Sequence, residues 1–464
     1  MKKLEIVETN VSPEESISFE RHIMLRAAVG IVVRRQLIVP ILGFTIVLLI
    51  LAWPIAAKCL GDCAPPSEWP QFQHDGRHTG YNAQETYLSM LNVGSLVQHW
   101  KSGPFSLDSS GYQVDPVVRK GVLYVTEIAN RAGVVTLHAL NARTGAPLWN
   151  TQLSFAEFTS VSPAAVLGDV IYLAMSYAAS PQNYYLAVAA VSATTHQLVW
   201  TSTPNVHTNP VLINGSRSYT LTVNNGVVAV CATGKSDENH FVNGTMLTYK
   251  AKTGALLATH LVQEFCIPPV VAGTRVYYPY PASYVTAADV NSLATLWSSY
   301  GFAFGLALGK SGYLIANGGN RIRAWDHLSG AIGWELQPAP ASSGFLGLAA
   351  GTPAVANGFA YVITSPYRLY KLYESGGVVW TLVIVDETIE SAPALANDVL
   401  FLIAGGKLIA LNATTGYILY SHTNADGAPF VGTPAIANGM VYVHAADAKG
   451  EYIYAFAPPV RDGA

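Results

Sequence analysis

The chain has 464 residues, of which 50% are hydrophobic and only 12% are charged, and its formal net charge is −3. This charge balance argues against nucleic-acid binding, because a phosphate-binding surface needs clustered Lys and Arg. The 40 Gly, 26 Pro and 25 Tyr residues predict many turns and strands rather than a helical protein.

Residues 37–57, LIVPILGFTIVLLILAWPIAA, carry no charged side chain and are long enough to cross a hydrocarbon core of about 30 Å. Basic residues precede this segment, whereas only Lys58 follows it closely. The positive-inside rule therefore predicts a single-pass protein of the cytoplasmic membrane, with residues 1–36 in the cytoplasm and the large remainder in the periplasm or at the cell surface. A cleaved signal peptide is the alternative, although its apolar region is usually shorter and no small-x-small cleavage site is obvious.

Residues 58–94 are predicted to be an extracytoplasmic linker and lead-in, and they contain the stretch EWPQFQHDGRHTGYN. His74 and His78 within it are four positions apart, a spacing that brings metal ligands together on a helix. The surrounding Gly and Pro argue against a helix, so the spacing does not predict a metal site. Trp69 and Phe72 are expected to anchor the stretch against the fold that follows, while its polar residues cap turns.

The four cysteines all lie on the predicted outer side of the membrane, where an even number indicates disulfides. Cys59 and Cys63 are candidates for a small loop at the membrane exit, and Cys231 and Cys266 for a larger one. A zinc site that uses all four is the alternative, but only one close pair exists.

A repeat with a period near 45 residues fills the rest of the chain. Its first phrase is a small residue, Pro, an apolar run, Gly and a strand that usually contains Tyr. The copies are DPVVRKGVLYV at Asp115, SPAAVLGDVIYL at Ser162, NPVLINGSRSYTL at Asn209, PPVVAGTRVYY at Pro268, a weaker LALGKSGYLIA at Leu306, TPAVANGFAYV at Thr352, APALANDVLFL at Ala392 and TPAIANGMVYV at Thr433.

The second phrase is an alternating strand, a turn that often contains Thr-Gly or Ser-Gly, and a strand that usually ends in an aromatic residue. Glycine suits such a turn because it adopts positive φ freely. The copies end at Trp149, Trp200, Ala258, Trp297, Trp334, Trp380 and Tyr420.

Each unit therefore predicts a four-stranded antiparallel blade, and the whole predicts an all-β, eight-bladed β-propeller over residues 95–458, with a tail at 459–464. The eighth unit lacks an outer strand. SLVQHWKS at residues 95–102, which contains Trp100, is expected to supply that strand and close the ring, which removes the open sheet edge. The recurring aromatics, Trp100 and Tyr420 included, are predicted to pack between blades rather than to form a ring of binding residues.

A family resemblance rests on these phrases. A-x-x-T-G-x-x-x-W, with T-P-A-x-x-N-G-x-x-Y-V ahead of it, resembles the PQQ-like β-propeller repeat, and EWPQFQHDGRHTGYN resembles the lead-in that precedes the first blade in many such proteins. The resemblance covers roughly Trp69 to Ala457 and implies the propeller fold. It does not imply one activity, because the superfamily includes quinoprotein dehydrogenases, an outer-membrane assembly lipoprotein that acts as a scaffold, and surface proteins.

The dehydrogenases of this superfamily need a calcium ion, an aspartate base and, typically, two adjacent cysteines against the quinone. The chain has neither a Cys-Cys pair nor the Asp-x-Asp element seen near the base in many of them. We therefore expect no catalytic residue, no cofactor and no metal ligand, and PQQ and calcium enter only if the protein is a dehydrogenase.

Three kinds of surface feature depart from the repeat. Asn214, Asn243 and Asn412 begin Asn-x-Ser/Thr sequons, which are candidates for glycosylation. A polar insertion at residues 233–243 is either an interaction loop or an idle one. The acidic pair at residues 386–387 either faces the central channel or forms a solvated turn.

The leading hypothesis is a membrane-anchored extracytoplasmic propeller that binds a protein partner, as a scaffold or a surface protein without catalysis. The alternatives are a quinoprotein dehydrogenase that uses PQQ and calcium, and a propeller that binds a small ligand or a glycan in its channel.

Overall fold

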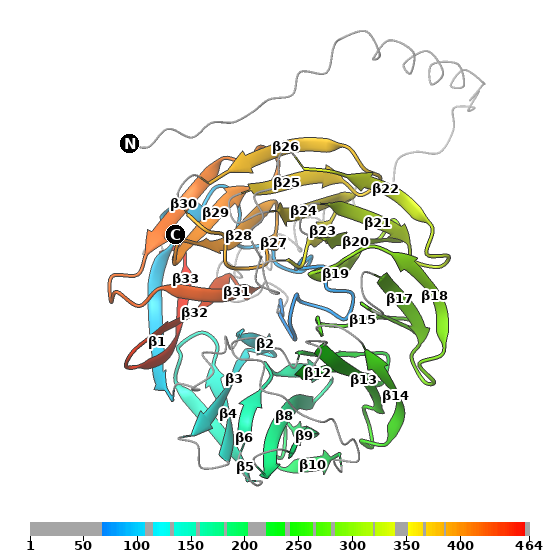
Figure 1. Cartoon of the computed structure of the whole chain (residues 1–464). Helices are drawn as coiled ribbons and strands as arrows, with labels where there is room; N and C mark the ends of the chain where they lie inside the picture. The colour runs from blue at the N-terminus through cyan, green and yellow to red at the C-terminus, as the bar shows by residue number, and fades with distance from the viewer. Residues whose placement is uncertain are drawn as a thin grey trace, which may run out of the picture. The chain divides into compact units, whose positions relative to one another are not determined.

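The computed structural model describes residues 67–106, 115–129, 134–154, 158–180, 183–202, 220–236, 242–262, 266–279, 284–318, 321–338, 351–364, 368–384 and 387–459. Eight antiparallel sheets are arranged in a ring around a central axis (Figure 1). Seven sheets have four strands and one has five. The predicted all-β, eight-bladed propeller is confirmed.

The first four blades follow one another along the chain, each running from an inner strand near the axis to an outer strand at the rim. Blade 1 contains β2 (Val117–Arg119), β3 (Val122–Ala129), β4 (Val134–Asn141) and β5 (Pro147–Ser154). Blade 2 contains an inner strand in two pieces, β6 (Phe158–Val161) and β7 (Ala165–Leu167), then β8 (Val170–Ser180), β9 (Asn183–Ser192) and β10 (Leu198–Thr201). Blade 3 contains β11 (Thr220–Asn224), β12 (Val227–Ser236), β13 (Val242–Lys250) and β14 (Leu256–Val262). Blade 4 contains β15 (Val270–Ala272), β16 (Arg275–Pro279), β17 (Tyr284–Asp289) and β18 (Thr295–Tyr300).

The next three blades repeat this order, and the eighth combines the two ends of the propeller sequence. Blade 5 contains β19 (Gly305–Leu308), β20 (Tyr313–Asn317), β21 (Ile322–Asp326) and β22 (Ile332–Leu336). Blade 6 contains β23 (Ala354–Ala356), β24 (Phe359–Thr364), β25 (Arg368–Tyr373) and β26 (Val378–Val383). Blade 7 contains β27 (Ala394–Ala396), β28 (Val399–Ala404), β29 (Lys407–Asn412) and β30 (Ile418–Thr423). Blade 8 contains β31 (Phe430–Ala437), β32 (Met440–Asp447) and β33 (Gly450–Ala457), with β1 (Val97–Phe105) paired antiparallel to β33 and a short 3₁₀ helix, η2 (Val93–Ser95), just before β1.

The turn between the third and fourth strands of a blade follows from its sequence. In blade 1 the side-chain oxygen of Asn141 accepts the backbone N–H groups of Arg143 and Thr144, at 2.9 and 3.1 Å. Gly145 then takes φ of +71°, which glycine adopts without a steric cost. Ser192, Asp289, Asp326 and Asn412 accept turn N–H groups in the same way in other blades.

The core lies between blades, where the apolar faces of neighbouring sheets meet. One cluster joins Leu137 and Ala139 of blade 1 to Ile171, Leu173 and Val191 of blade 2, and all five side chains are fully buried. Burial of this kind contributes roughly 25 cal/mol per Å² of apolar surface, so each blade is stabilised mainly by its neighbours.

The prediction for the inner strand of blade 3 was wrong. The phrase at Asn209 lies outside the described residues, and the inner strand is β11, which is followed by a turn at Asn225 and Gly226. The physical reason is pairing: Asn224 lies opposite Val227, so this second Asn-Gly turn, not the earlier one, leads into the long strand β12.

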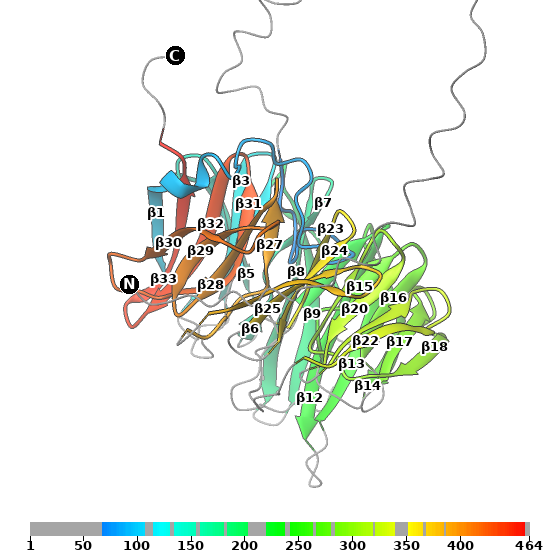
Figure 2. The ribbon, with the colours of Figure 1, turned by 90° about the horizontal axis from the view of Figure 1, so that it is seen from above.

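Of the predicted polar insertion at residues 233–243, the described parts, 233–236 and 242–243, belong to strands. β12 continues to Ser236 and β13 begins at Val242, and these two residues lie opposite each other. The two strands form a long hairpin that extends away from the end of the ring where the lead-in lies (Figure 2).

In the part of the chain that the structure describes, no helix is both long and apolar enough to cross a membrane. The predicted span at residues 37–57 and the Cys59–Cys63 pair lie outside these residues.

Candidate functional site

Residues 69–82 form a continuous segment that we call the collar, and it lies in the middle of the ring (Figure 1). The collar makes hydrogen bonds with the inner strand of every blade in turn. The pairs are Trp69 with Val118, Pro70 with Val166, Gln71 with Val223, Gly76 with Val271, Arg77 with Leu308, Thr79 with Val355, Gly80 with Leu395, and Asn82 with Ile436. The stretch that contains the two closely spaced histidines is therefore an architectural element that ties all eight blades together at one end of the channel.

Asn82 joins the end of the collar to its beginning. The side-chain Nδ2 of this fully buried residue donates to the carbonyl oxygen of Glu68 at 2.9 Å and to that of Ile436 at 2.7 Å. Its Oδ1 accepts the backbone N–H of Gln84 at 3.0 Å. Glu68 directly precedes Trp69, which contacts blade 1, and Ile436 lies in blade 8. The Asn82 amide therefore connects the first and the last blade of the ring.

The polar residues of the collar serve its own turns and do not converge on a metal ion. Asp75 accepts N–H groups from Arg77 and Thr79 at 2.9 and 3.2 Å and the Thr79 hydroxyl at 2.7 Å. The His78 Nε2 lies 2.9 Å from the Thr222 hydroxyl, and burial lowers the pKa of His78 to about 4, so its ring is neutral. His74 instead packs edge-on against the Trp69 ring.

The recurring tryptophans lie at the rim and contact the next blade. Five of them donate the indole N–H to a carbonyl in the neighbouring turn, at 2.8–3.3 Å: Trp100 to Ala142, Trp200 to Ala251, Trp297 to His327, Trp334 to Glu374 and Trp380 to Ala413. Trp149 stacks on the ring of His196, with centroids 4.3 Å apart. Tyr420 is partly buried against the core, and burial raises its pKa to about 12.

These contacts explain why glycine recurs in the turns. A Cβ atom at Gly145, Gly254 or Gly330 would lie 2.4–2.6 Å from the indole of the preceding blade. The Thr-Gly pair in the sequence therefore indicates both a glycine with positive φ and an indole ring packed on the turn. The tryptophans and glycines of these turns are partly or fully buried and equivalent from blade to blade, which does not suit a ring of binding residues.

Sequence reasoning missed one buried polar cluster beside the blade 8–blade 1 junction. Asp115 accepts the backbone N–H of Thr433 at 2.7 Å, and burial raises the pKa of Asp115 to about 6. His444 and Glu451 are also buried, 3.6 Å apart, and the ring nitrogens of His444 make no hydrogen bond within the described chain. The only sequence signal was an aspartate where the other proline-containing first phrases begin with Ser, Asn, Pro, Thr or Ala.

The raised pKa of Asp115 predicts that the free energy of unfolding depends on pH. Below pH 4 Asp115 is protonated in both the folded and the unfolded chain, whereas between pH 4 and 6 only the unfolded chain ionises. Stability from this group is therefore lost as pH rises through about 6. Asp115→Asn keeps the acceptor for Thr433 and should raise the free energy of unfolding by about 2–3 kcal/mol at pH 7.5, with little change at pH 4. Urea unfolding at both pH values measures this, with exposed Asp169→Asn as the control; an equal shift at both pH values would contradict it.

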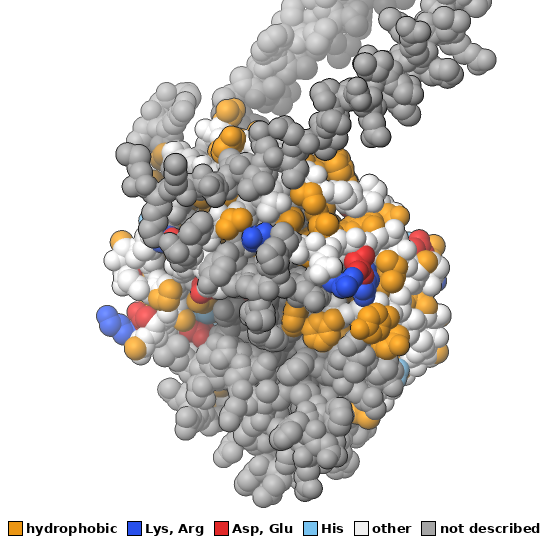
Figure 3. Space-filling view, turned by 45° about the horizontal axis from the view of Figure 1, so that its top comes forward, with side chains coloured by type: hydrophobic (Ala, Val, Ile, Leu, Met, Phe, Trp, Pro, Cys, Tyr) orange, Lys and Arg blue, Asp and Glu red, His pale blue; other side chains and the backbone are white. Residues whose placement is uncertain are grey.

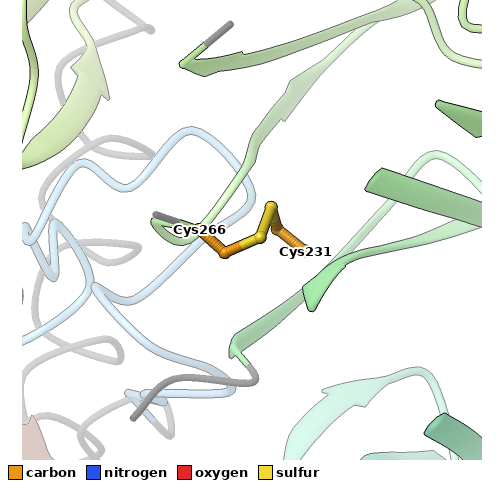
Figure 4. The surroundings of a disulfide bond; sticks show 2 residues. All are labelled: Cys231 and Cys266. Carbon is orange, nitrogen blue, oxygen red and sulfur yellow. A yellow bond between two sulfur atoms is a disulfide. The ribbon is translucent and has the colours of Figure 1, made fainter. Parts of the chain in front are cut away.

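The side chains present do not fit a PQQ–calcium centre. Calcium takes six to eight oxygen ligands. Among the described residues no group of three or more His, Cys, Asp or Glu side chains could hold a metal ion. The buried cluster at Asp115 contains His444 beside the carboxylates of Asp115 and Glu451. Cys231 and Cys266 form a disulfide between β12 and the segment before β15, 35 positions apart, as the sequence predicted (Figure 4).

Comparison with known proteins identifies the repeat. A family model described as outer membrane protein assembly factor BamB matches residues 92–236, 186–308, 318–429 and 390–457. The chain belongs to this PQQ-like repeat family. The matched residues include every blade, and the predicted superfamily is thereby confirmed.

Solved structures similar to this chain include dehydrogenases and a BamB protein. A europium-containing methanol dehydrogenase has 13% identity and a TM-score of 0.64, with 84% of this chain and 98% of that chain covered. The quinohemoprotein alcohol dehydrogenase from Comamonas testosteroni has 14% identity and a TM-score of 0.60, with 86% and 82% covered. BamB from Moraxella catarrhalis has 14% identity and a TM-score of 0.54, with 80% and 99% covered. No curated protein sequence matches the chain. At these identities the likeness shows the PQQ-like propeller fold alone.

An exposed group of aromatic residues in this PQQ-like propeller, which we call the aromatic patch, was not recognised from the sequence. Tyr284, Tyr300 and Phe302 are 38%, 62% and 39% exposed, and the two tyrosine rings lie edge to face with centroids 5.6 Å apart. The Arg323 guanidinium lies 5.7 Å from the Tyr300 ring centre and pairs with Glu335, which also pairs with Arg321. Figure 3 shows one face of the molecule, where apolar side chains of the described residues surround groups of basic and acidic side chains.

The remaining candidates have local roles or fall outside the described residues. Asn412 accepts two turn N–H groups, at 2.8 and 3.1 Å, and is half-buried. Asn214 lies outside the described residues, and only the backbone of Asn243, in β13, is described. Of the acidic pair, Asp386 lies outside the described residues and Glu387 pairs with Lys407.

Proposed function

We propose that this protein is a membrane-anchored, extracytoplasmic propeller that binds a protein partner through the aromatic patch. The patch carries the proposal, because Tyr and Arg are enriched at the energetic centres of protein interfaces and here they lie together on an exposed surface. Membrane anchoring by residues 37–57 and the location outside the cytoplasm are parts of the same proposal, supported by the hydropathy and charge of the sequence.

The distribution of polar side chains also supports binding over channel chemistry. The collar fills one end of the channel with residues that bond to the inner strands. Tyr300, by contrast, is 62% exposed at the end of β18, where a partner can reach it. Scaffolding needs only such a surface on a rigid ring, and the propeller supplies the rigidity through the inter-blade contacts of its tryptophans.

The test is site-specific photo-crosslinking in the native membrane, with p-benzoylphenylalanine at position 300. Position 373 is the matched control, because Tyr373 is also exposed, at 49%, and lies in blade 6. We expect one discrete adduct at position 300 that disappears when Tyr284 and Phe302 are replaced with serine, and no such adduct at position 373. Equal labelling at both positions would refute the patch as an interface.

The dehydrogenase alternative makes a different prediction. Stoichiometric binding of PQQ with Ca²⁺, together with dye-linked oxidation of alcohols or sugars by the full-length chain, would replace the binding proposal. We expect neither, because the described donor set does not suit calcium.

A further inference from the structure

A second surface feature lies at the opposite end of blade 4 from the aromatic patch. In β17, Tyr284 pairs with Tyr300 at one end, whereas Asp289 pairs with Arg275 at the other. Beside Arg275 lies a groove of about 580 Å³. The collar and the turns of blades 3, 4 and 5 supply its lining: Arg77, Asn224, Asn225, Ala272, Gly273, Thr274, Arg275, Tyr277, Leu308, Lys310, Gly312, His327 and Leu328.

The charged side chains that line the groove are all basic. Arg77, Arg275 and Lys310 line it, whereas no Asp or Glu does. The whole chain has 26 Lys and Arg against 29 Asp and Glu, so the groove does not reflect its average composition. None of the three cations forms an ion pair with a carboxylate of the described chain. Their positive charge is therefore available to a ligand.

Both guanidinium groups are held in place before any ligand arrives. Arg77 Nε donates to the carbonyl of Leu308 at 3.2 Å, and its Nη2 donates to that of Gly309. Arg275 Nη1 donates to the carbonyl of Leu328 at 2.9 Å. A guanidinium has five N–H donors, so each arginine keeps donors for an anion while its side chain is already ordered. Ordered donors lower the entropic cost of binding.

The walls of the groove suit an organic anion better than an inorganic one. Leu328 is 57% exposed and offers apolar surface at the groove, whereas Tyr277 and Leu308 are buried beneath it. An inorganic ion has no carbon skeleton to cover the exposed Leu328 side chain. A chain with several carboxylates can pair with the cations and place its carbon skeleton against the apolar wall.

We propose that this groove binds an organic anion that carries two or more carboxylates. Two sources share this chemistry, an acidic peptide segment and a free organic polyacid. The inference is independent of the aromatic patch, because it rests on residues at the other end of blade 4.

The experiment uses the full-length chain and three probes: a fluorescent hexaglutamate peptide, citrate and inorganic phosphate. Anisotropy follows the peptide, and calorimetry follows the other two. We expect saturable binding of a carboxylate probe that weakens with salt, since the cations are accessible to solvent. Lys310→Glu should weaken it about tenfold, which corresponds to roughly 1.4 kcal/mol. Lys310 is exposed and has no hydrogen bond or ion pair in the structure, so this change should not affect folding.

The controls distinguish binding in the groove from a general effect of the protein's charge. Lys449→Glu makes the same charge change at an exposed turn of blade 8 and should alter affinity less than twofold. Arg275→Gln, checked by thermal unfolding, should weaken binding at least as much as Lys310→Glu. Peptide binding identifies a peptide source, and citrate binding alone identifies a free polyacid. Tighter binding of phosphate, equal loss in Lys449→Glu, or no binding of any probe would overturn the assignment.

Discussion

Asn82→Asp is expected to lower the free energy of unfolding by about 3–5 kcal/mol at pH 7, although the two side chains have nearly the same shape. The amide donates to the carbonyls of Glu68 and Ile436 in a fully buried position. A carboxylate there donates nothing and faces both carbonyl oxygens. Each buried carbonyl left without a donor costs about 1–3 kcal/mol, and the buried charge adds to that cost. Guanidinium unfolding followed by tryptophan fluorescence measures the difference.

A matched variant tests whether the loss of stability comes from the buried position or from the change of amide to carboxylate itself. Asn92 also donates its amide to a carbonyl, that of Tyr87 at 2.7 Å, but this bond is exposed to solvent. Asn92→Asp should therefore cost less than about 1 kcal/mol. The loss of unfolding free energy in Asn82→Asp should be smaller below pH 4 than at pH 7, because a protonated carboxyl donates one hydrogen bond. Equal losses in the two variants would mean that the collar does not hold the blades together.

The repeat made the blade predictable because each local rule agrees with the others. At Asn141 and Asp326 the side chain caps the turn, and at Gly145 and Gly330 the backbone takes positive φ against a neighbouring indole. Trp149 alone would say little, but its recurrence predicted a structural role that the contacts in the structure match. Signals of this kind lie within a few residues of one another, so the sequence carries them directly.

The parts that resisted prediction depend on contacts between distant segments. The collar bonds to the inner strands of all eight blades, and the order of those strands around the axis is set only when the ring is closed. No neighbouring residue in the sequence marks Asn82 as the one that links the first and last blades. Likewise, Asp115 and His444 are far apart in sequence and meet because blade 8 lies beside blade 1. In blade 3 the sequence contains two Asn-Gly pairs, at Asn214 and Asn225, and only the pairing of β11 with β12 shows that the second one forms the turn after the inner strand.

Removal of the disulfide is expected to lower the free energy of unfolding by about 4 kcal/mol, because a cross-link across 35 positions restricts the unfolded chain. Cys231 and Cys266 are 0% and 1% exposed and join blade 3 to the segment that enters blade 4. Cys231→Ala with Cys266→Ala should show the loss in urea unfolding, and the reduced wild-type chain should unfold at the same urea concentration as the double variant. Cys59→Ala with Cys63→Ala is the control and should leave propeller stability unchanged. If reduction costs the wild type nothing while the double variant is destabilised, packing of the buried sulfurs rather than the cross-link holds blades 3 and 4 together.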